Sequence, residues 1–355
     1  MSEERIVPDA AAFAATASRA TLLGTTLFQA LLVAIVVLWV LDIPRVVFGA
    51  SFYVEQMLTV SLGLTLALAF IAESGRRRHW SDWVAVALSL ALCGYIAVFY
   101  ERLTQDAPML PWDGLIVSAL LVFLVLEGSR RISGWGFVGI ILAMAVYIFI
   151  SPHLSGAFQT RYVSPERLTI YLGLDLNGAI GPILQVSVLI VIPFTILGQV
   201  LARTGGADFF ADLSMSAMAR FRGGAAKIAV VGSALFGMIS GSAVSNVLAV
   251  GIVTIPAMAR SGFSRYRAAA IESVGSTGGQ LMPPVMGAAA FIMAEFLQVS
   301  YGAVCIAAAI PAILYYACLF IHVDLEAAKH KIGTADLKDA PAFSEVMKSG
   351  WHFLM

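Results

Sequence analysis

The sequence predicts an all-α polytopic membrane protein, and its composition and apolar pattern carry this prediction. Of the 355 residues, 59% are hydrophobic and 12% are charged, about half the charged fraction of a soluble domain. Two long apolar stretches, 228–258 and 268–298, are interrupted by helix-breaking residues. Seven others are long enough to cross a hydrocarbon core about 30 Å thick, and they lie near 22–41, 54–72, 83–100, 114–127, 135–151, 178–201 and 303–323. We therefore expect about seven full spans, one re-entrant helical hairpin and one broken helix.

Basic residues alternate between the loops and predict the orientation of the chain. The loops after the second, fourth and sixth spans are rich in Lys and Arg, and together with the segment 259–267 and both chain ends they hold 18 of the 22 basic residues. The other four are Arg45, Arg102, Arg161 and Arg167. Basic loops mark the cytoplasmic side, so residues 1–19 are expected to form a cytoplasmic tail. The apolar run after Arg19 is too long for a signal peptide and predicts a retained first span.

The stretch 228–258 is predicted to be the re-entrant hairpin. Residues 202–227 and 259–267 are both basic, so the apolar stretch between them must leave and return on one face. The run SGSAVSN, from Ser240 to Asn246, divides it into two arms of about 12 residues. At about 1.5 Å per residue each arm is roughly 18–20 Å long, which places the polar tip near the middle of the membrane.

The stretch 268–298 is predicted to cross the membrane as a broken helix. Pro283 and Pro284 disfavour helical geometry at the residue before each of them, and Gly278 and Gly279 remove stiffness just upstream. We expect a helix to about Thr277, an extended break through Pro284 and a second helix to about Leu297.

The two breaks predict a binding site at membrane depth. Backbone groups without helical partners persist in lipid only where protein or a water-filled cavity satisfies them, and paired broken segments are typical of ion and substrate sites. Small hard cations prefer oxygen ligands. The candidate sodium ligands combine side chains of the hairpin tip with carbonyls of the broken helix: Ser242, Ser245, Asn246, Gly279, Met282 and Pro284. Neutral donors beside them, Ser276, Thr277 and Gln280, are the candidates for binding an anionic substrate. The alternative is that these small residues only allow helices to pack closely.

Three carboxylates near membrane spans have other possible roles. Glu272 and Glu295 flank the broken segment, and each could be protonated, paired with a basic residue or a proton site. Arg265 and Arg267 lie one to two turns before Glu272, which favours a structural role near the interface. Glu127 precedes two arginines and is predicted to be their interfacial partner.

Several classes of function are disfavoured. The five histidines lie in loops or at span ends, with no intramembrane Ser–His pair or HExxH motif, and there is no Walker A motif. We therefore predict neither an enzyme nor a self-contained ATP-driven pump, and no cofactor apart from a coupling sodium ion. Zero net charge argues against a nucleic-acid partner. The isolated Cys93, Cys305 and Cys318 are interpreted as small hydrophobic residues.

Two further segments are predicted to be short helices. Ser164, Pro165 and Glu166 have the pattern of a helix start, with Ser as the cap. Residues 206–222 place Phe209 and Phe210 on one face, which suits a helix lying on the cytoplasmic surface or an ordinary connecting helix.

The string from RTGGADFF through FRGGAAKIAVVGSALFGMISGSAVSNVLAVGIVTIPAM to ESVGSTGGQLMPPVMGAAAFIMAEF resembles the large membrane subunit of TRAP (tripartite ATP-independent periplasmic) transporters. The resemblance covers residues 20–355 and is most specific over 200–300. It is closest to the fused permeases of the TAXI type, in which a small subunit precedes the large one. On this pattern 20–130 is a four-helix scaffold domain, 131–324 the first half of the large subunit and 325–355 a cytoplasmic linker.

This resemblance implies sodium-coupled import of an organic acid, such as a dicarboxylate-like anion, across the bacterial inner membrane. It also implies a periplasmic substrate-binding protein as partner, surrounding membrane lipid, and an elevator mechanism. Asn246 matches the asparagine of the family's hairpin tip, and the GGQLMPP segment matches its unwound helix; both are implicated in sodium coordination there. The family's large subunit has two inverted repeats and this sequence holds one, so we expect a fragment that needs its missing second half. The alternatives are a non-transporting membrane scaffold and a symporter that works without a binding protein.

Overall fold

A computed structural model describes residues 19–49, 52–71, 80–334 and 341–354, and every regular element in these ranges is helical. Within the described ranges, six helical segments are long and apolar enough to cross a membrane, and shorter apolar helices accompany them. The predicted all-α polytopic architecture is confirmed. Residues 1–18 of the predicted tail and the basic run at Arg76–Arg78 lie outside the described residues.

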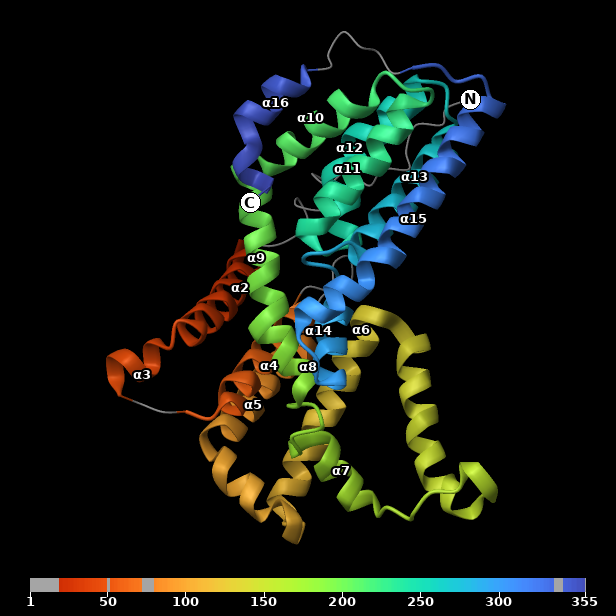
Figure 1. The fold of residues 1–355 in the computed structure, drawn as a ribbon. Helices are drawn as coiled ribbons and strands as arrows, with labels where there is room; N and C mark the ends of the chain where they lie inside the picture. The colour runs from red at the N-terminus through yellow and green to blue at the C-terminus, as the bar shows by residue number, and fades with distance from the viewer. Residues whose placement is uncertain (1–18, 50–51, 72–79, 335–340, 355) are drawn as a thin grey trace. The chain divides into compact units, whose positions relative to one another are not determined.

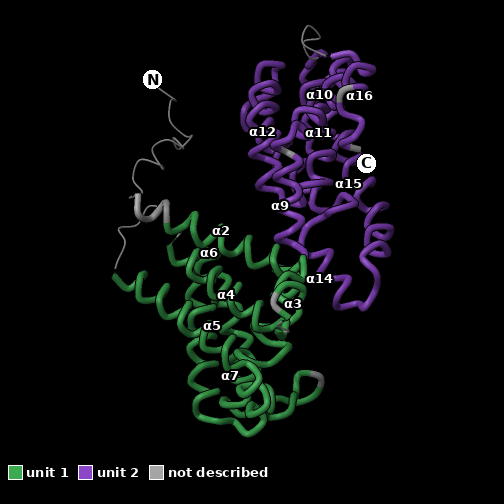
Figure 2. Tube along the Cα trace, turned by 90° about the vertical axis from the view of Figure 1, so that its left-hand side faces the viewer, with its two compact units in different colours: residues 1–189 green, residues 190–355 purple. Residues whose placement is uncertain are grey.

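The chain divides into two compact units, 1–189 and 190–355 (Figure 2). The longer helices of the first unit are α2 (Arg19–Val40), α3 (Ile43–Phe48), α4 (Val54–Ile71), α5 (Trp80–Asp106), α6 (Trp112–Ile150), α7 (Pro165–Leu174) and α8 (Pro182–Val186). The second unit contains α9 (Ile192–Leu201), α10 (Ala207–Met218), α11 (Gly224–Ser240), α12 (Ala243–Arg260), α13 (Arg265–Gly278), α14 (Ala288–Leu297), α15 (Tyr301–Lys329) and α16 (Phe343–Gly350).

Short helices link several of these elements. They are 3₁₀ turns at Ala107–Met109 (η1), Ser151–His153 (η2), Gly156–Phe158 (η3), Gly279–Leu281 (η6) and Trp351–Leu354 (η8), and π-helical turns at Ser187–Val191 (η4) and Ala202–Gly206 (η5). The sixth predicted span, 178–201, is therefore built from α8, η4 and α9 in succession.

The fourth and fifth predicted spans both lie in α6, on either side of a kink. The helix is interrupted at Gly134, whose φ of 80° and ψ of 179° only a glycine adopts without strain. Its first half carries the charged cluster that the sequence predicted: Glu127 accepts from Arg130 at 2.7 Å and from Arg131 at 2.8 Å. Arg131 also donates to Asp82 at the start of α5, at 2.7 Å. The pairing of Glu127 with the two arginines is confirmed, and its place at the membrane interface stays a prediction.

The second unit is organised around α11, α12, α13 and α15 (Figure 1). Their shared core is made of small and aliphatic side chains, including Ala226, Val230, Met258, Ala268 and Val323. Small residues let the helix backbones approach closely, which is the usual basis of helix packing in lipid.

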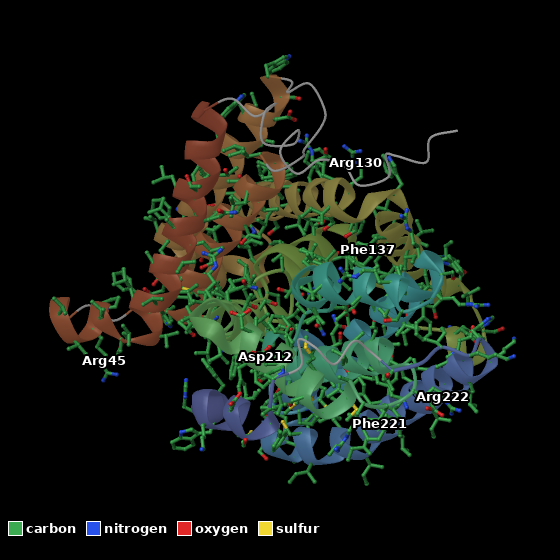
Figure 3. The ribbon with its side chains drawn as sticks, turned by 90° about the horizontal axis from the view of Figure 1, so that it is seen from above. Arg45, Arg130, Phe137, Asp212, Phe221 and Arg222 are labelled. Atoms are coloured by element: carbon green, nitrogen blue, oxygen red, sulfur yellow. The ribbon has the colours of Figure 1, made fainter. Side chains whose placement is uncertain are left out.

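An ion pair closes one end of this core. Lys227 of α11 is buried, donates to Asp324 of α15 at 2.6 Å and lies over the rings of Phe221 and Phe320. Arg222 donates to the same aspartate; Figure 3 labels it beside Phe221.

The helix predicted over 206–222 is present as α10, and its aromatic face packs against protein. Phe209 and Phe210 are buried with Val346 of α16, and Phe353 lies 5.7 Å from Phe209 between ring centroids. Asp212 of the same helix is exposed. Part of the expected linker 325–355 is therefore helix α16, which is seated on α10. The cap at Ser164 is confirmed, since its hydroxyl accepts from the backbone N–H of Arg167 at 3.3 Å.

Candidate functional site: the paired breaks of the second unit

The hairpin turns within two residues. Gly241 ends α11 in the left-handed region, with φ of 58°. Ser242 is extended and caps α12 by accepting from the backbone N–H of Ser245 at 3.3 Å. The arms have 17 and 18 residues, which corresponds to about 25 and 27 Å. The predicted arms of about 12 residues were too short. Helix α11 already begins at Gly224 and continues through Ser240, and α12 runs from Ala243 to Arg260, so that only Gly241 and Ser242 leave the helix at the turn.

The break in the second segment has a more compact form than predicted. Helix α13 ends at Gly278, close to the expected Thr277, and α14 ends at Leu297 as expected. The expected extended break was wrong over Gly279–Leu281, which form the 3₁₀ turn η6. The second helix begins at Ala288, not directly after Pro284, because the chain first closes a loop in which the N–H of Gly287 donates to the carbonyl of Gln280 at 2.8 Å.

The two breaks touch through their backbones. A methyl group built on Gly237 of α11 would lie 2.4 Å from the Cα of Gly279, and one on Gly241 would lie 2.1 Å from the carbonyl oxygen of Met286. The N–H of Val285 donates to the carbonyl of Met238 at 3.1 Å. Glycine is thus required at Gly237 and Gly241 by close approach, and the hairpin and the broken helix form one packed assembly.

Asn246 lies fully buried beside this contact. Its Nδ2 donates to the carbonyl of Ser233 at 2.8 Å and would lie 3.1 Å from a methyl group on Gly279. Its Oδ1 is buried and has no hydrogen-bond partner among the described residues, and the same is true of the hydroxyl of Ser240. A buried acceptor without a donor is costly, and an amide oxygen in that state is suited to bind a cation.

The other candidate sodium ligands differ in their surroundings. Ser242 is occupied as the helix cap, and Ser245 accepts from Gln199 of α9 at 2.9 Å. The carbonyl of Pro284 accepts from the phenol of Tyr301 at 2.9 Å, and the N–H of Met282 donates to the carbonyl of Gly279 at 3.2 Å. The structure therefore brings Asn246 and Gly279 together, while hydrogen bonds direct Ser245 toward α9 and Pro284 toward α15. Neither Gln199 nor Tyr301 could be recognised as part of this site from the sequence, because each reaches it from another helix.

The three candidate substrate ligands are also divided. Ser276 is buried and donates to Glu272 at 3.0 Å. Thr277 is exposed and donates to the carbonyl of Ser273 at 2.8 Å, and Gln280 is exposed beside Gly287. Gln280 is therefore accessible to a ligand, Thr277 is accessible but uses its hydroxyl hydrogen within α13, and Ser276 faces the interior.

Glu272 is the main functional candidate whose surroundings the sequence did not predict. It is 1% exposed, and the hydroxyls around it belong to Ser233, Thr254 and Ser276. No ion pair of the described residues includes it. Arg267 instead pairs with Glu326 at 2.9 Å. Of the three states left open for Glu272, pairing with a basic residue is excluded for the described part of the chain.

Comparison with known proteins identifies the chain. The family model described as "Tripartite ATP-independent periplasmic transporter, DctM component" matches residues 120–355, which include both breaks. Together with the apolar helices, this match defines a membrane permease, a class distinct from enzymes. The chain belongs to the DctM family of TRAP transporter permeases.

Curated relatives agree with this assignment. The C4-dicarboxylate TRAP transporter large permease protein DctM of Pseudomonas aeruginosa is 31% identical over 164 residues, covering 46% of this chain and 36% of that protein. The uncharacterized protein YgiK of Salmonella typhimurium is 28% identical over 215 residues, 60% of this chain and 48% of the relative. The isethionate TRAP transporter permease protein DctMQ of Oleidesulfovibrio alaskensis is 36% identical over 95 residues, 26% of this chain and 15% of the relative. The matched part thus spans less than half the length of each of these relatives.

Proposed function

We propose that this permease takes part in sodium-coupled import of small organic acids delivered by a periplasmic substrate-binding protein. The observation that carries the proposal is the buried Oδ1 of Asn246, which has no hydrogen-bond partner among the described residues and belongs to a side chain whose Nδ2 lies close to Gly279. A coordinating cation would satisfy this oxygen, and a site composed of neutral oxygens favours a monovalent ion that needs little charge compensation.

The proposed sodium shell is built around Asn246 and Gly279. Ser242 can contribute from the hairpin turn, because a hydroxyl that accepts one hydrogen bond retains a second lone pair. Gly279 can contribute in the same way, because its carbonyl accepts one hydrogen bond, from the N–H of Met282. Ser245 and Pro284 are assigned to a state of the site in which their hydrogen bonds with Gln199 and Tyr301 are rearranged, and Met282 stays a candidate through its carbonyl.

The proposed substrate class rests on the names of relatives and on exposed donors. Two relatives are named for the transport of C4-dicarboxylate and of isethionate, both of which are organic anions. Gln280 is exposed at the break and offers a neutral amide donor to such a group, and exposed Thr277 would offer its hydroxyl only by releasing the carbonyl of Ser273. Ser276 would join them only by leaving Glu272.

The remaining assignments are proposals of the same kind. We place the chain in a bacterial inner membrane, among lipid, with its N-terminus cytoplasmic, because 18 of its 22 basic residues lie on one predicted side. A chain that supplies the second repeat is the proposed partner besides the binding protein. Membership of the TAXI-type fused permeases stays a prediction.

Sodium binding can be tested on the purified full chain in detergent. Sodium chloride is expected to raise its unfolding temperature above that in choline chloride, because a ligand that binds only the folded state stabilises it. Asn246→Ala should lose this sodium-specific shift. Asn177→Ala is the matched control, since it makes the same change at the exposed asparagine of the first unit. Equal sodium shifts in the two variants would refute the assignment of Asn246.

A transport assay separates the proposal from its alternatives. The full chain in proteoliposomes, with a binding protein loaded with a C4-dicarboxylate, is expected to show sodium-driven uptake once a second-repeat chain is present. Uptake without the binding protein would favour the binding-protein-independent symporter, and no uptake in any combination would favour the scaffold. A control substitution for this assay is Cys318→Ala, because Cys318 is exposed. Cys305→Ala is unsuitable, because Sγ of Cys305 lies 3.6 Å from the carbonyl oxygen of Pro284.

A further inference from the structure

Glu272 lies where three helices meet, and each of them gives it a hydroxyl. Ser233 of α11 lies 2.8 Å from Oε1, and Ser276 of α13 lies 3.0 Å from the same oxygen. Thr254 of α12 lies against Oε2. The α12 backbone is also close, since a methyl group on Gly251 would lie 3.0 Å from Cγ of Glu272. The side chain of Glu272 is therefore enclosed by α11, α12 and α13.

The hydrogen bonds of Thr254 indicate where a proton is needed. Its hydroxyl has one hydrogen and faces two oxygens, Oε2 of Glu272 and the carbonyl of Val250 at 3.1 Å. If the carboxylate is ionised, the hydroxyl can donate to only one of them. If Oε2 carries a proton, Oε2–H donates to the hydroxyl of Thr254 and that hydroxyl donates to Val250. Every polar atom of the group is then satisfied.

The basic residues nearest this carboxyl group are either paired with other carboxylates or lie too far along their helices. On α11, Lys227 is paired with Asp324 of α15. On α13, Arg267 is paired with Glu326 of α15, and Arg265 is about 10 Å away along the helix. Arg260 ends α12 six residues, or about 9 Å, beyond Thr254.

The phenol hydroxyls of α15 near Glu272 donate their hydrogen bonds to backbone carbonyls. Tyr316, which is within electrostatic range of Glu272, donates to the carbonyl of Gly275 at 2.8 Å, and Tyr315 donates to that of Val274 at 2.7 Å. An ionised Glu272 would therefore be a buried charge without a counter-ion among the described residues, which is strongly unfavourable.

We propose that Glu272 is a proton-binding site, separate from the sodium site. Its Oε2 holds one proton and donates a hydrogen bond to the hydroxyl of Thr254. The proton comes from solvent and converts the carboxylate to a carboxylic acid, with no other bond made or broken. It allows α11, α12 and α13 to pack around a neutral group. The inference depends on the contacts of Glu272 and does not require that Asn246 bind sodium.

Infrared spectroscopy of the full chain in detergent tests the inference directly. The wild-type protein at neutral pH is expected to show the C=O stretch of a protonated carboxyl group, shifted by deuterium exchange, and Glu272→Gln should lose it. Glu326→Gln, which alters an ion-paired carboxylate, is the matched control and should keep it. Spectra of the wild type and Glu272→Gln that do not differ in this region would overturn the proposal.

Two further measurements keep the test decisive if Glu272→Gln folds poorly. Thr254→Val retains the carboxyl and removes its acceptor, so the C=O band should shift in frequency; an unshifted band would contradict the assigned hydrogen bond. An unfolded glutamate ionises near pH 4, so the proton is released on unfolding and the wild type should lose stability as pH rises. Glu272→Gln should lose less over the same range, because it lacks this proton and is otherwise identical to the wild type; parallel curves would refute the proposal.

Discussion

Gly237→Ala tests the contact that joins the two breaks. The added methyl group would lie 2.4 Å from the Cα of Gly279, whereas carbon atoms pack at about 3.5 Å or more. The backbones of α11 and η6 must therefore separate by about 1 Å. Overpacking of this kind typically costs about 1–3 kcal/mol. For a unit the size of residues 190–355 this lowers the unfolding midpoint by roughly 2–12 °C.

The assay is thermal unfolding of the purified full chain, with and without sodium. Gly302→Ala is the matched control, because Gly302 lies in α15 of the same unit and a methyl group there meets nothing within 4 Å. It should be neutral or stabilising by up to about 1 kcal/mol, since alanine favours the helix. Gly237→Ala should also reduce the sodium shift, because the methyl group would lie 3.1 Å from Nδ2 of Asn246. If the two variants unfold at the same temperature, the close contact is wrong.

Two other variants probe the packing of the second unit. Phe209→Ala should lower the free energy of unfolding by about 3 kcal/mol through the cavity it leaves, and it should speed hydrogen exchange in α16. Phe296→Ala is the control and should do neither, because Phe296 is 63% exposed. Unchanged exchange in α16 would contradict the packing of α16 on α10. Asp324→Asn should lower the unfolding temperature by leaving the ammonium of Lys227 buried without a counter-ion, and adding Lys227→Met should restore it. A double variant no more stable than Asp324→Asn would refute the ion-pair reasoning.

The sequence was sufficient to predict the position of both breaks because their causes are local. Gly241 must adopt a left-handed conformation and Ser242 caps the next helix, and both preferences belong to the residue types. Pro283 and Pro284 act locally in the same way. What the sequence could not fix is how far helical geometry continues on each side, since helical hydrogen bonds can extend through Ser240 and resume at Ala243.

The surroundings of Glu272 could not be predicted, because counting turns from Arg267 was misleading. Five residues correspond to about 140° around a helix, so the two side chains point to different faces. Arg267 reaches Glu326 of α15. The hydroxyls of Ser233 and Thr254 come from helices whose contacts depend on tertiary packing. The buried oxygen of Asn246 likewise arises only where α11 meets η6.

The hydrogen bond between Val285 and Met238 has a consequence for membrane insertion. The hairpin turn is synthesised first, yet its backbone meets its partners only after the chain has been made through Gly287. At about 5–20 residues per second, the intervening 46 residues, from Gly241 to Gly287, take about 2–9 s to translate. During that interval the nascent turn is without these partners, so the translocon or an insertase must shelter it from lipid until the second break arrives.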